Sequence, residues 1–495
     1  MKIGPDKEVP QAIAAVLDTL RGEVLCDVQT PQARTSLLNA IRLLGRVLDE
    51  LAVGDTLARE CAADWQALHA EIEAALGAPR AAGADAAAAD AHQQLKKRSS
   101  EIQALLRASA GSERAKRVAA DWVERMTRAH ERLFDCREEA LLNFTAPILP
   151  RADTETQPLH HALSRYLSER FPRLDAGMLR RVRILPGGYS KQTALLELTA
   201  NDDLPSHLVI RRDIVRGSST GTSAANEFPL LQQMHAAGLP VPRPLLAEAD
   251  PERIGGGFIL MEEIVGATRA GELFPELNGG ASYHPDFPFE VARVLAALHR
   301  MSALPPSFRT SGHFAHGDDP MATVRGFQEM WRNLTSPPFT ALMDAGYAWL
   351  LANPVAPGRL RRVVHADVGA HNILTRDGHL AALLDWELTH LGDPAQDLAM
   401  VRTLLIEPLM PWQRFVDEYL AAGGPIEACD PHAVHWFSVW NHVRNSTFTS
   451  ILYNRVREGV LGDINNIAAG WDYTARVQRY LAKDLARALR SGRTE

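Results

Sequence analysis

The residues best suited to chemistry lie in one short segment that contains two aspartates and an asparagine. Asp367 and Asn372 are close neighbours in VVHADVGAHN, and Asp385 follows after a mainly apolar stretch. A carboxylate can orient a hydroxyl group and take its proton, and carboxylate and amide oxygens are the hard ligands that Mg²⁺ prefers. Asp367 suits the first task, and Asn372 with Asp385 suits the second. Transfer of a phosphoryl group needs both. The alternative is that all three only form turns, which Asp and Asn favour.

A β-hairpin is expected to bring these side chains together. We predict strands over 372–374 and 380–384, joined by a turn at Arg376-Asp377-Gly378, because Asp and Gly between apolar runs indicate a tight turn. The second strand ends at Asp385. The hairpin would therefore return Asp385 to the side of Asn372, and the three polar groups would converge on one small region.

The motif H-x-D-x-x-x-x-N at 365–372, followed by a strand and Asp385, resembles the catalytic loop and metal site of the aminoglycoside phosphotransferase family, relatives of protein kinases. The runs LDWE at 384–387, GDP at 392–394 and DLA at 397–399 extend the match. More closely, the segment resembles the kinase-like domain linked to some acyl-CoA dehydrogenases. The resemblance covers roughly residues 160–480 and implies a two-lobed kinase-like fold.

The resemblance implies a role for each residue of the loop. Asp367 would be the catalytic base, Asn372 a metal ligand and Asp385 the principal magnesium ligand, while His365 would brace the loop. The family usually has glycine where this chain has Ala366. Alanine costs little there if the backbone keeps a negative φ, and more if it does not. Further along, Asp393 and Asp397 are expected to cap a helix or to hold the loop by accepting backbone N–H bonds.

The resemblance also implies a nucleotide site in the β-rich part of the chain. Gly187, Gly188 and Ser190 match a loop between two strands whose backbone N–H groups approach phosphate, although a plain hairpin turn would also use two glycines. Arg211 stands where the third strand of the family carries lysine, and Glu227 would be its ion-pair partner. Arg212 is a rival for the same role, and an exposed strand charge is the alternative for Arg211. Glu227 could equally be an acid in the first turn of a helix.

Two further segments are candidates for ligand contact by the same resemblance. Residues 261–263 would form a hinge that binds the purine through backbone groups of Met261 and Glu263. The segment 435–459 would line the acceptor pocket, with four candidate residues at helical spacing, for which core packing is the alternative: Trp440, Asn441, Arg444 and Asn445.

The pattern of apolar residues predicts an α+β protein with a two-lobed kinase-like fold preceded by an all-helical domain. Residues 1–145 show helical periodicity without evident catalytic chemistry. Residues 155–265 form the N-lobe. We predict one helix before its first three strands and another helix after them. Residues 266–490 are mainly helical around the β-hairpin and form the C-lobe.

Composition excludes several classes of protein. The chain has 495 residues, which exceeds what one hydrophobic core usually organises. Its net charge is −7 and it has no basic stripe, so nucleic acid is not an expected partner. Its 4 cysteines form no CxxC pair, which argues against a zinc site or a disulfide framework. No apolar segment is long enough to span a membrane, and the N-terminus lacks the apolar core of a signal peptide. We therefore expect a cytoplasmic protein.

The leading hypothesis is a kinase that moves the γ-phosphoryl group of ATP or GTP, with Mg²⁺, to a hydroxyl of a small molecule. The resemblance to the domain linked to acyl-CoA dehydrogenases favours a hydroxyacyl-CoA or hydroxy acid. An aminoglycoside is the alternative substrate, which the segment 435–459 disfavours because cationic antibiotics bind acidic pockets and this segment is richer in arginine than in acids. A nucleotide-binding pseudokinase or scaffold is the competing function, prompted by Ala366 and Arg211. A homodimer, and a protein partner for the helical N-terminal domain, are left open.

Overall fold

The computed structural model describes residues 157–173, 177–185, 191–213, 222–275, 282–314, 319–334, 340–356, 359–457 and 473–491. The expected helical domain 1–145 and the glycine loop with Gly187, Gly188 and Ser190 lie outside these residues.

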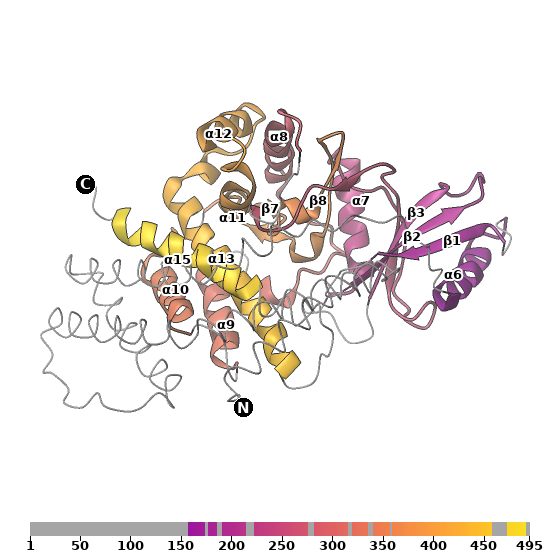
Figure 1. Cartoon of the computed structure of the whole chain (residues 1–495), viewed down its shortest axis with the longest axis horizontal. Helices are drawn as coiled ribbons and strands as arrows, with labels where there is room; N and C mark the ends of the chain where they lie inside the picture. Colours follow the sequence, from indigo (N-terminus) through magenta and orange to yellow (C-terminus); the bar gives the residue numbers. More distant parts are fainter. Residues whose placement is uncertain are drawn as a thin grey trace, which may run out of the picture.

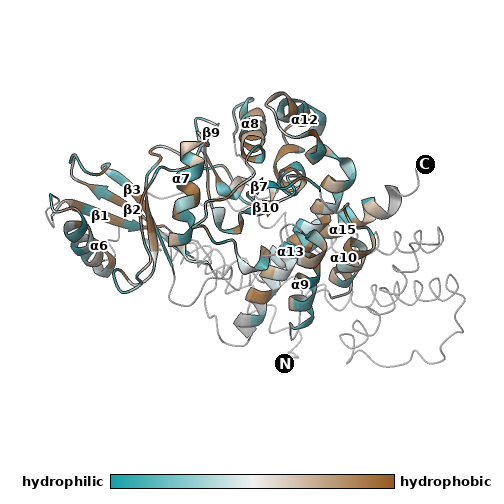
Figure 2. Cartoon of the chain, turned by 180° about the vertical axis from the view of Figure 1, so that it is seen from behind, coloured by the Kyte–Doolittle hydropathy of each residue, from teal (hydrophilic) through white to brown (hydrophobic). Residues whose placement is uncertain are grey.

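A five-stranded antiparallel sheet forms one end of the described chain (Figure 1). Its strand order is β1-β2-β3-β5-β4, and the strands are β1 (Leu179–Ile184), β2 (Lys191–Leu198), β3 (His207–Asp213), β4 (Pro244–Glu248) and β5 (Phe258–Glu262). Figure 2 shows a mixture of apolar and polar residues along these strands, as expected where successive side chains point to opposite faces. The sequence predicted β1, β2, β3 and β5 but not β4, a short strand that begins with proline.

Helices cover this sheet on both sides. Helix α6 (Gln157–Arg170) packs on one face through Leu163 and Leu167, which share a hydrophobic core with residues such as Leu208 and Leu260. Helix α7 (Phe228–Ala236) belongs instead to the large core that continues into the second lobe. It follows a short 3₁₀ turn, Ala224–Glu227, and Pro229 occupies its first turn, where the missing N–H costs nothing. Helix α7 therefore lies between the sheet and the second lobe (Figure 1).

The second lobe is mainly helical and encloses small sheets. Its helices are α8 (Phe287–His299), α9 (Pro320–Arg332), α10 (Thr340–Ala352), α11 (Ala395–Val401), α12 (Trp412–Ala421), α13 (Pro431–Arg457) and α15 (Thr474–Ser491). Strands β6 (Thr268–Arg269), β8 (Ile373–Arg376) and β9 (His379–Leu383) form one sheet, and β7 (Arg362–Val364) pairs with β10 (His390–Gly392). The kinase-like arrangement of a β-rich lobe and a helical lobe is the one that the sequence predicted.

The predicted hairpin forms, and its turn explains its register. Strands β8 and β9 pair antiparallel, with Ile373 opposite Leu383 and Arg376 opposite His379. The two turn residues, Asp377 and Gly378, have φ values of 53° and 80°. This left-handed pair is the backbone that closes a two-residue hairpin without splaying the strands. The open end of the hairpin therefore lies beside the loop 365–372.

Candidate active site

The catalytic loop is tied to helix α11 by one buried carboxylate. Asp397 is fully buried, and its two oxygens accept the N–H groups of His365, at 2.8 Å, and Ala366, at 2.7 Å. His299 Nε2 lies 3.1 Å from the same carboxylate. Burial raises the pKa of Asp397, but the bond and charge of His299 and the bonds from the loop outweigh it, so the pKa falls below its ordinary value. Asp397 thus holds the loop, as the sequence predicted.

Ala366 adopts a backbone that L-residues rarely use. Its φ is 69°, in the left-handed region, and its side chain is fully buried. A left-handed backbone costs a residue with a Cβ about 1–2 kcal/mol, a cost that glycine would avoid. The hydrogen bond from Ala366 to Asp397 holds the loop in this conformation, so the alanine is accommodated rather than excluded.

Asp367 is held in place by its neighbours and kept ionised. Asn372 Nδ2 donates to Asp367 Oδ2 at 2.9 Å and to the Asp367 carbonyl oxygen at 3.0 Å, and His371 Nε2 lies 3.4 Å from Oδ2. Burial by itself raises the pKa of Asp367, but His371, by charge and hydrogen bond, and then Arg444 and His365 lower it to about 2. Asp367 is therefore a carboxylate at neutral pH, ready to accept a hydrogen bond from a hydroxyl. Sequence reasoning missed His371, although it directly precedes Asn372.

Asp385 reaches the same region from the end of β9. The Leu384 N–H donates to the Asn372 carbonyl at 2.8 Å, so the hairpin brings Asp385 beside Asn372 as predicted. Asp385 has a φ of 65°, a second strained backbone of the kind that gathers at functional sites. Arg211 Nη2 donates to Asp385 Oδ1 at 2.8 Å. Burial raises the pKa of Asp385, but Arg211 and Lys191 outweigh it and lower the pKa.

Arg211 joins the two lobes through carboxylates. Its Nη1 donates to Glu227 Oε2 at 3.1 Å while its Nη2 binds Asp385. The predicted pair of Arg211 with Glu227 therefore forms, and Glu227 is almost fully buried, unlike an ordinary acid in a first helical turn. Arg212 is turned to the other face of β3, where it donates to Gln192 Oε1 and the Ile254 carbonyl. Because successive side chains of a strand point to opposite faces, Arg211 rather than Arg212 reaches Glu227 and Asp385.

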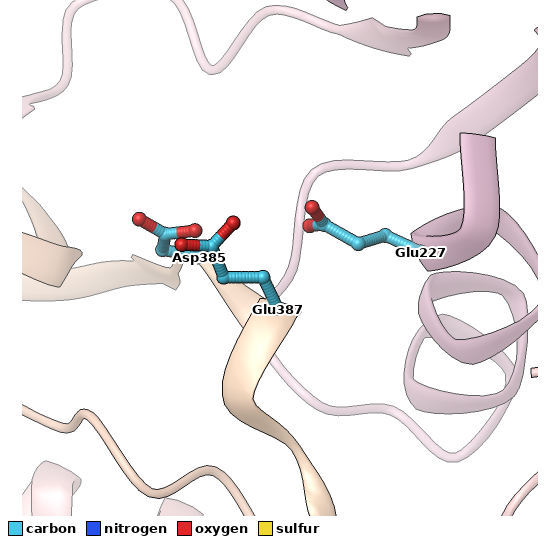
Figure 3. A group of neighbouring side chains, drawn as sticks. All are labelled: Glu227, Asp385 and Glu387. Carbon is cyan, nitrogen blue, oxygen red and sulfur yellow. The ribbon is translucent and has the colours of Figure 1, made fainter. Parts of the chain in front are cut away.

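Two charged residues that the sequence did not single out complete this cluster. Lys191, the first residue of β2, is 2% exposed and forms ion pairs with Glu227 Oε1, at 3.1 Å, and with Glu387 Oε2. Glu387 follows Asp385 in the LDWE run, so that motif contained the signal. Figure 3 shows Glu227 facing Asp385 and Glu387 from the other lobe.

This donor set fits a magnesium ion. Carboxylate oxygens of Glu227, Asp385 and Glu387 lie within 4.8 Å of one another, and carboxylate oxygens are what Mg²⁺ prefers. The amide nitrogen of Asn372 is committed to Asp367, which leaves its amide oxygen as an acceptor. Burial, then the charge of Asp385, raise the pKa of Glu387. The carboxylates therefore repel one another, and cations must balance them.

The predicted hinge is partly engaged in the sheet. Met261 lies in β5 and is 4% exposed. The Glu263 N–H donates to the His207 carbonyl at 3.1 Å. The neighbouring Glu262 N–H donates to the Arg243 carbonyl at 2.9 Å. Those two N–H groups are thus already satisfied within the protein. A purine at this segment has to use carbonyl oxygens or the residues that follow, such as Val265, which is 52% exposed.

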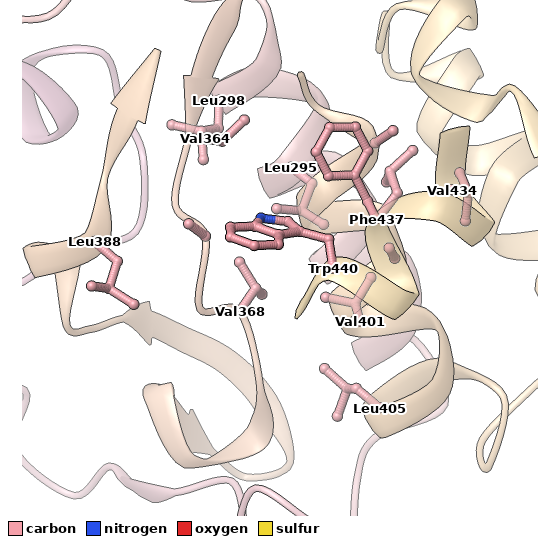
Figure 4. Close-up of a cluster of buried hydrophobic side chains, with 14 of the residues drawn as sticks. Leu295, Leu298, Val364, Val368, Leu388, Val401, Leu405, Val434, Phe437 and Trp440 are labelled. Atoms are coloured by element: carbon pink, nitrogen blue, oxygen red, sulfur yellow. The ribbon is translucent and has the colours of Figure 1, made fainter. Parts of the chain in front are cut away.

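The four candidates on α13 differ in their surroundings. Trp440 is 3% exposed and packs edge-on against Phe327, within the apolar cluster drawn in Figure 4; these contacts are those of the core-packing alternative. Asn441 is also buried and donates to the Gln396 carbonyl at 2.9 Å. The amide nitrogen of Asn441 is therefore engaged, whereas its buried Oδ1 has no hydrogen-bond partner among the described residues.

Arg444 is a buried cationic side chain on the same helix. It is fully buried, and only its Nε finds a hydrogen-bond partner among the described residues, Asn445 Oδ1 at 3.0 Å. Its charge acts on Asp367. Burial lowers the pKa of Arg444, while Asp367 and Asp397 raise it. An arginine buried with two unpaired nitrogens is costly, so it is suited to an anionic or carbonyl oxygen that the described residues do not supply.

Comparison with known proteins identifies the family. The model of the phosphotransferase enzyme family matches residues 181–436, which is more than half of the 495-residue chain and contains the loop, the hairpin and the charged cluster. The chain belongs to the phosphotransferase enzyme family.

Several relatives of this phosphotransferase are known by name. Human acyl-CoA dehydrogenase family member 11 is 27% identical over 178 residues, which cover 35% of this chain and 22% of that protein. Viomycin phosphotransferase from Streptomyces vinaceus is 31% identical over 115 residues, 20% of this chain and 40% of that protein. The chain thus matches about a fifth of the length of the acyl-CoA dehydrogenase relative.

Among solved structures, a putative aminoglycoside phosphotransferase from Ralstonia eutropha JMP134 aligns with a TM-score of 0.47 and 16% identity over 66% of this chain and 98% of that one.

Within the described residues, no helix combines the length and the apolar character that crossing a lipid bilayer requires.

Proposed function

We propose that this phosphotransferase is a small-molecule kinase that moves the γ-phosphoryl group of ATP or GTP to a hydroxyl. The observation that carries the proposal is the pairing of an ionised Asp367 with Asn372 beside the Arg211–Asp385–Glu227 cluster. Asp367 would orient the acceptor hydroxyl and take its proton. Asn372 and Asp385, with Glu387, would hold Mg²⁺, which neutralises phosphate charge when bound.

The acceptor that we propose is a hydroxyacyl-CoA or a hydroxy acid. The likeness to acyl-CoA dehydrogenase family members supports this class. Arg444 supports it physically, because a buried guanidinium whose charge acts on Asp367 favours an acceptor with a carboxylate or carbonyl oxygen. A polycationic aminoglycoside would instead meet a like charge. Because the chain also resembles viomycin phosphotransferase, an antibiotic is included among the acceptors to be tested.

Asp367→Asn tests the reaction. We expect a loss of about 10²–10⁴-fold in kcat, because the amide keeps the shape of the side chain but cannot accept the proton. Nucleotide consumption is measured with hydroxyacyl-CoAs, hydroxy acids, sugars and aminoglycosides as acceptors. Asp417→Asn is the matched control, since Asp417 is exposed on α12 and accepts a hydrogen bond from Gln413 of the same helix. Full activity of the Asp367 variant would contradict the assigned role.

A nucleotide-binding scaffold is the second candidate, and the strained Ala366 is the observation that favours it. Thermal unfolding with ATP or GTP, with and without Mg²⁺, separates the two. Stabilisation by nucleotide that is indifferent to Mg²⁺, together with no turnover of any acceptor, supports the scaffold. Stabilisation that requires Mg²⁺ supports the kinase.

A further inference from the structure

Lys191 is a buried ammonium that the proposed reaction leaves without a task. It begins β2, directly after the loop between β1 and β2, and only 2% of it is exposed. Burial lowers the pKa of Lys191, but Glu227 and Glu387 outweigh it and raise the pKa. The lysine is therefore charged. Burying a charged lysine is costly, so its place among these carboxylates has a physical reason.

The register of the sheet aims Lys191 at the same region as Arg211. Thr193 lies opposite Arg211 in the β2–β3 pair, and Lys191 lies two residues before Thr193. Side chains two residues apart share one face of a sheet. Lys191 and Arg211 therefore project together toward Glu227 and the second lobe. Arg212, one residue on, points to the opposite face.

Lys191 and a divalent cation compete for the same oxygens. Lys191 contacts Glu227 and Glu387, two of the three acids whose oxygens lie within 4.8 Å of one another. The contact with Glu227 Oε1 lacks hydrogen-bond geometry, so the ammonium is bound chiefly to Glu387. Two cations cannot share one carboxylate pocket at contact distance without strong repulsion. A metal ion that enters has to displace the ammonium.

We propose that Lys191 is a second phosphate-binding cation of the nucleotide site, which neutralises Glu387 and Glu227 until a magnesium nucleotide displaces it onto the terminal phosphates. Arg211 keeps its bond to Glu227 in this exchange. The two cations differ in suitability: the planar guanidinium of Arg211 already bridges two carboxylates, whereas lysine has a flexible stem and a compact charge that can change partners. This inference rests on the proposed function and adds a residue to it.

The test uses the full-length protein and Lys191→Met, which keeps the length of the side chain and removes its charge. Lys191→Arg retains the charge. Lys483→Met is the matched control, because Lys483 is exposed on α15. Binding of Mn²⁺ without nucleotide is measured by electron paramagnetic resonance. Binding of ATP, GTP, AMP and GMP with Mg²⁺ is measured by calorimetry.

In the Lys191→Met variant we expect Mn²⁺ to bind about tenfold more tightly, because the competing charge is gone. We also expect the preference for nucleoside triphosphate over monophosphate to fall about tenfold, while the affinity for AMP or GMP stays unchanged. Lys191→Arg should keep most of that preference, and Lys483→Met all of it.

Both changes must appear, and an unchanged value of either one overturns the proposal. If the wild type binds triphosphates but Lys191→Met behaves like it, Lys191 is only a structural ion pair and the proposed function stands. If the wild type binds no nucleotide, the proposed function itself fails. Should Lys191→Met not fold, Lys191→Gln removes the charge but keeps a polar group that can donate to Glu387. An unchanged triphosphate preference in that variant overturns the proposal equally.

Discussion

Two residues at the active site have a backbone that is unusual for their residue type. Ala366, which precedes the proposed base Asp367, and Asp385, a proposed metal ligand, both have positive φ. Such conformations cost about 1–3 kcal/mol each and persist where the surroundings enforce them. At Ala366 the enforcing contact is the bond to Asp397. The geometry of Asp367, which follows directly, therefore rests on a residue with no chemistry of its own.

Ala366 offers a test at this scale. We expect Ala366→Val to lower the free energy of unfolding by about 1–3 kcal/mol, because a β-branched side chain fits a left-handed backbone poorly. Ala366→Gly should stay within about 1 kcal/mol of the wild type, since relief of strain offsets the greater entropy of the unfolded glycine chain. Denaturant unfolding gives both values. Equal stability of the two variants would count against a left-handed residue 366.

At the scale of elements, helix α13 approaches α10 closely at a glycine. A Cβ added at Gly346 on α10 would lie 2.7 Å from Val443 Cγ2 on α13. Val443 is fully buried, so it has no room to yield. This close approach fixes α13, and with it Arg444, relative to the rest of the lobe.

Gly346→Ala should therefore destabilise the protein by about 1–3 kcal/mol through overpacking. This is opposite to the usual effect of alanine in a helix. Gly326→Ala on α9 is the matched control, because nothing lies within 4 Å of its added Cβ and the position is exposed. We expect that variant to gain about 0.5–1 kcal/mol. Thermal unfolding distinguishes the two variants. If both were more stable than the wild type, α10 and α13 would lie further apart than the contact of Gly346 with Val443 indicates.

At the scale of the whole molecule, the two lobes meet through charges at the active site. Arg211 links Glu227 of the first lobe to Asp385 of the second, and Lys191 links Glu227 to Glu387. The apolar core also continues from α7 into the second lobe. Ligand binding at the charged cluster is therefore expected to stabilise both lobes together.

This coupling predicts how nucleotide changes thermal stability. A magnesium nucleotide at about 100 times its dissociation constant should add about 2.7 kcal/mol, and Arg211→Met should lose most of that gain, because the guanidinium no longer joins the lobes or meets phosphate. The quantity compared is the difference with and without nucleotide for each variant. Arg212→Met is the control, since Arg212 faces away from the site. An undiminished gain in the Arg211 variant would mean that nucleotide binds elsewhere.

The sequence by itself determined the local chemistry and the elements that carry it. The loop with Asp367 and Asn372, the Asp-Gly hairpin and the pairing of Arg211 with Glu227 all follow from short-range patterns or from the resemblance. Turn residues and alternation act over a few positions, so one sequence suffices to predict them.

Only the tertiary structure decided which distant charges meet. Lys191 and Glu387 are far apart in the chain, and neither belongs to a pattern that predicts the other, yet sheet register and lobe packing bring them into contact. The same applies to the burial of Trp440 and Arg444, which share one helix but differ in their partners. Contacts of this kind arise from the packing of whole elements, and packing is a property of the folded chain rather than of any segment.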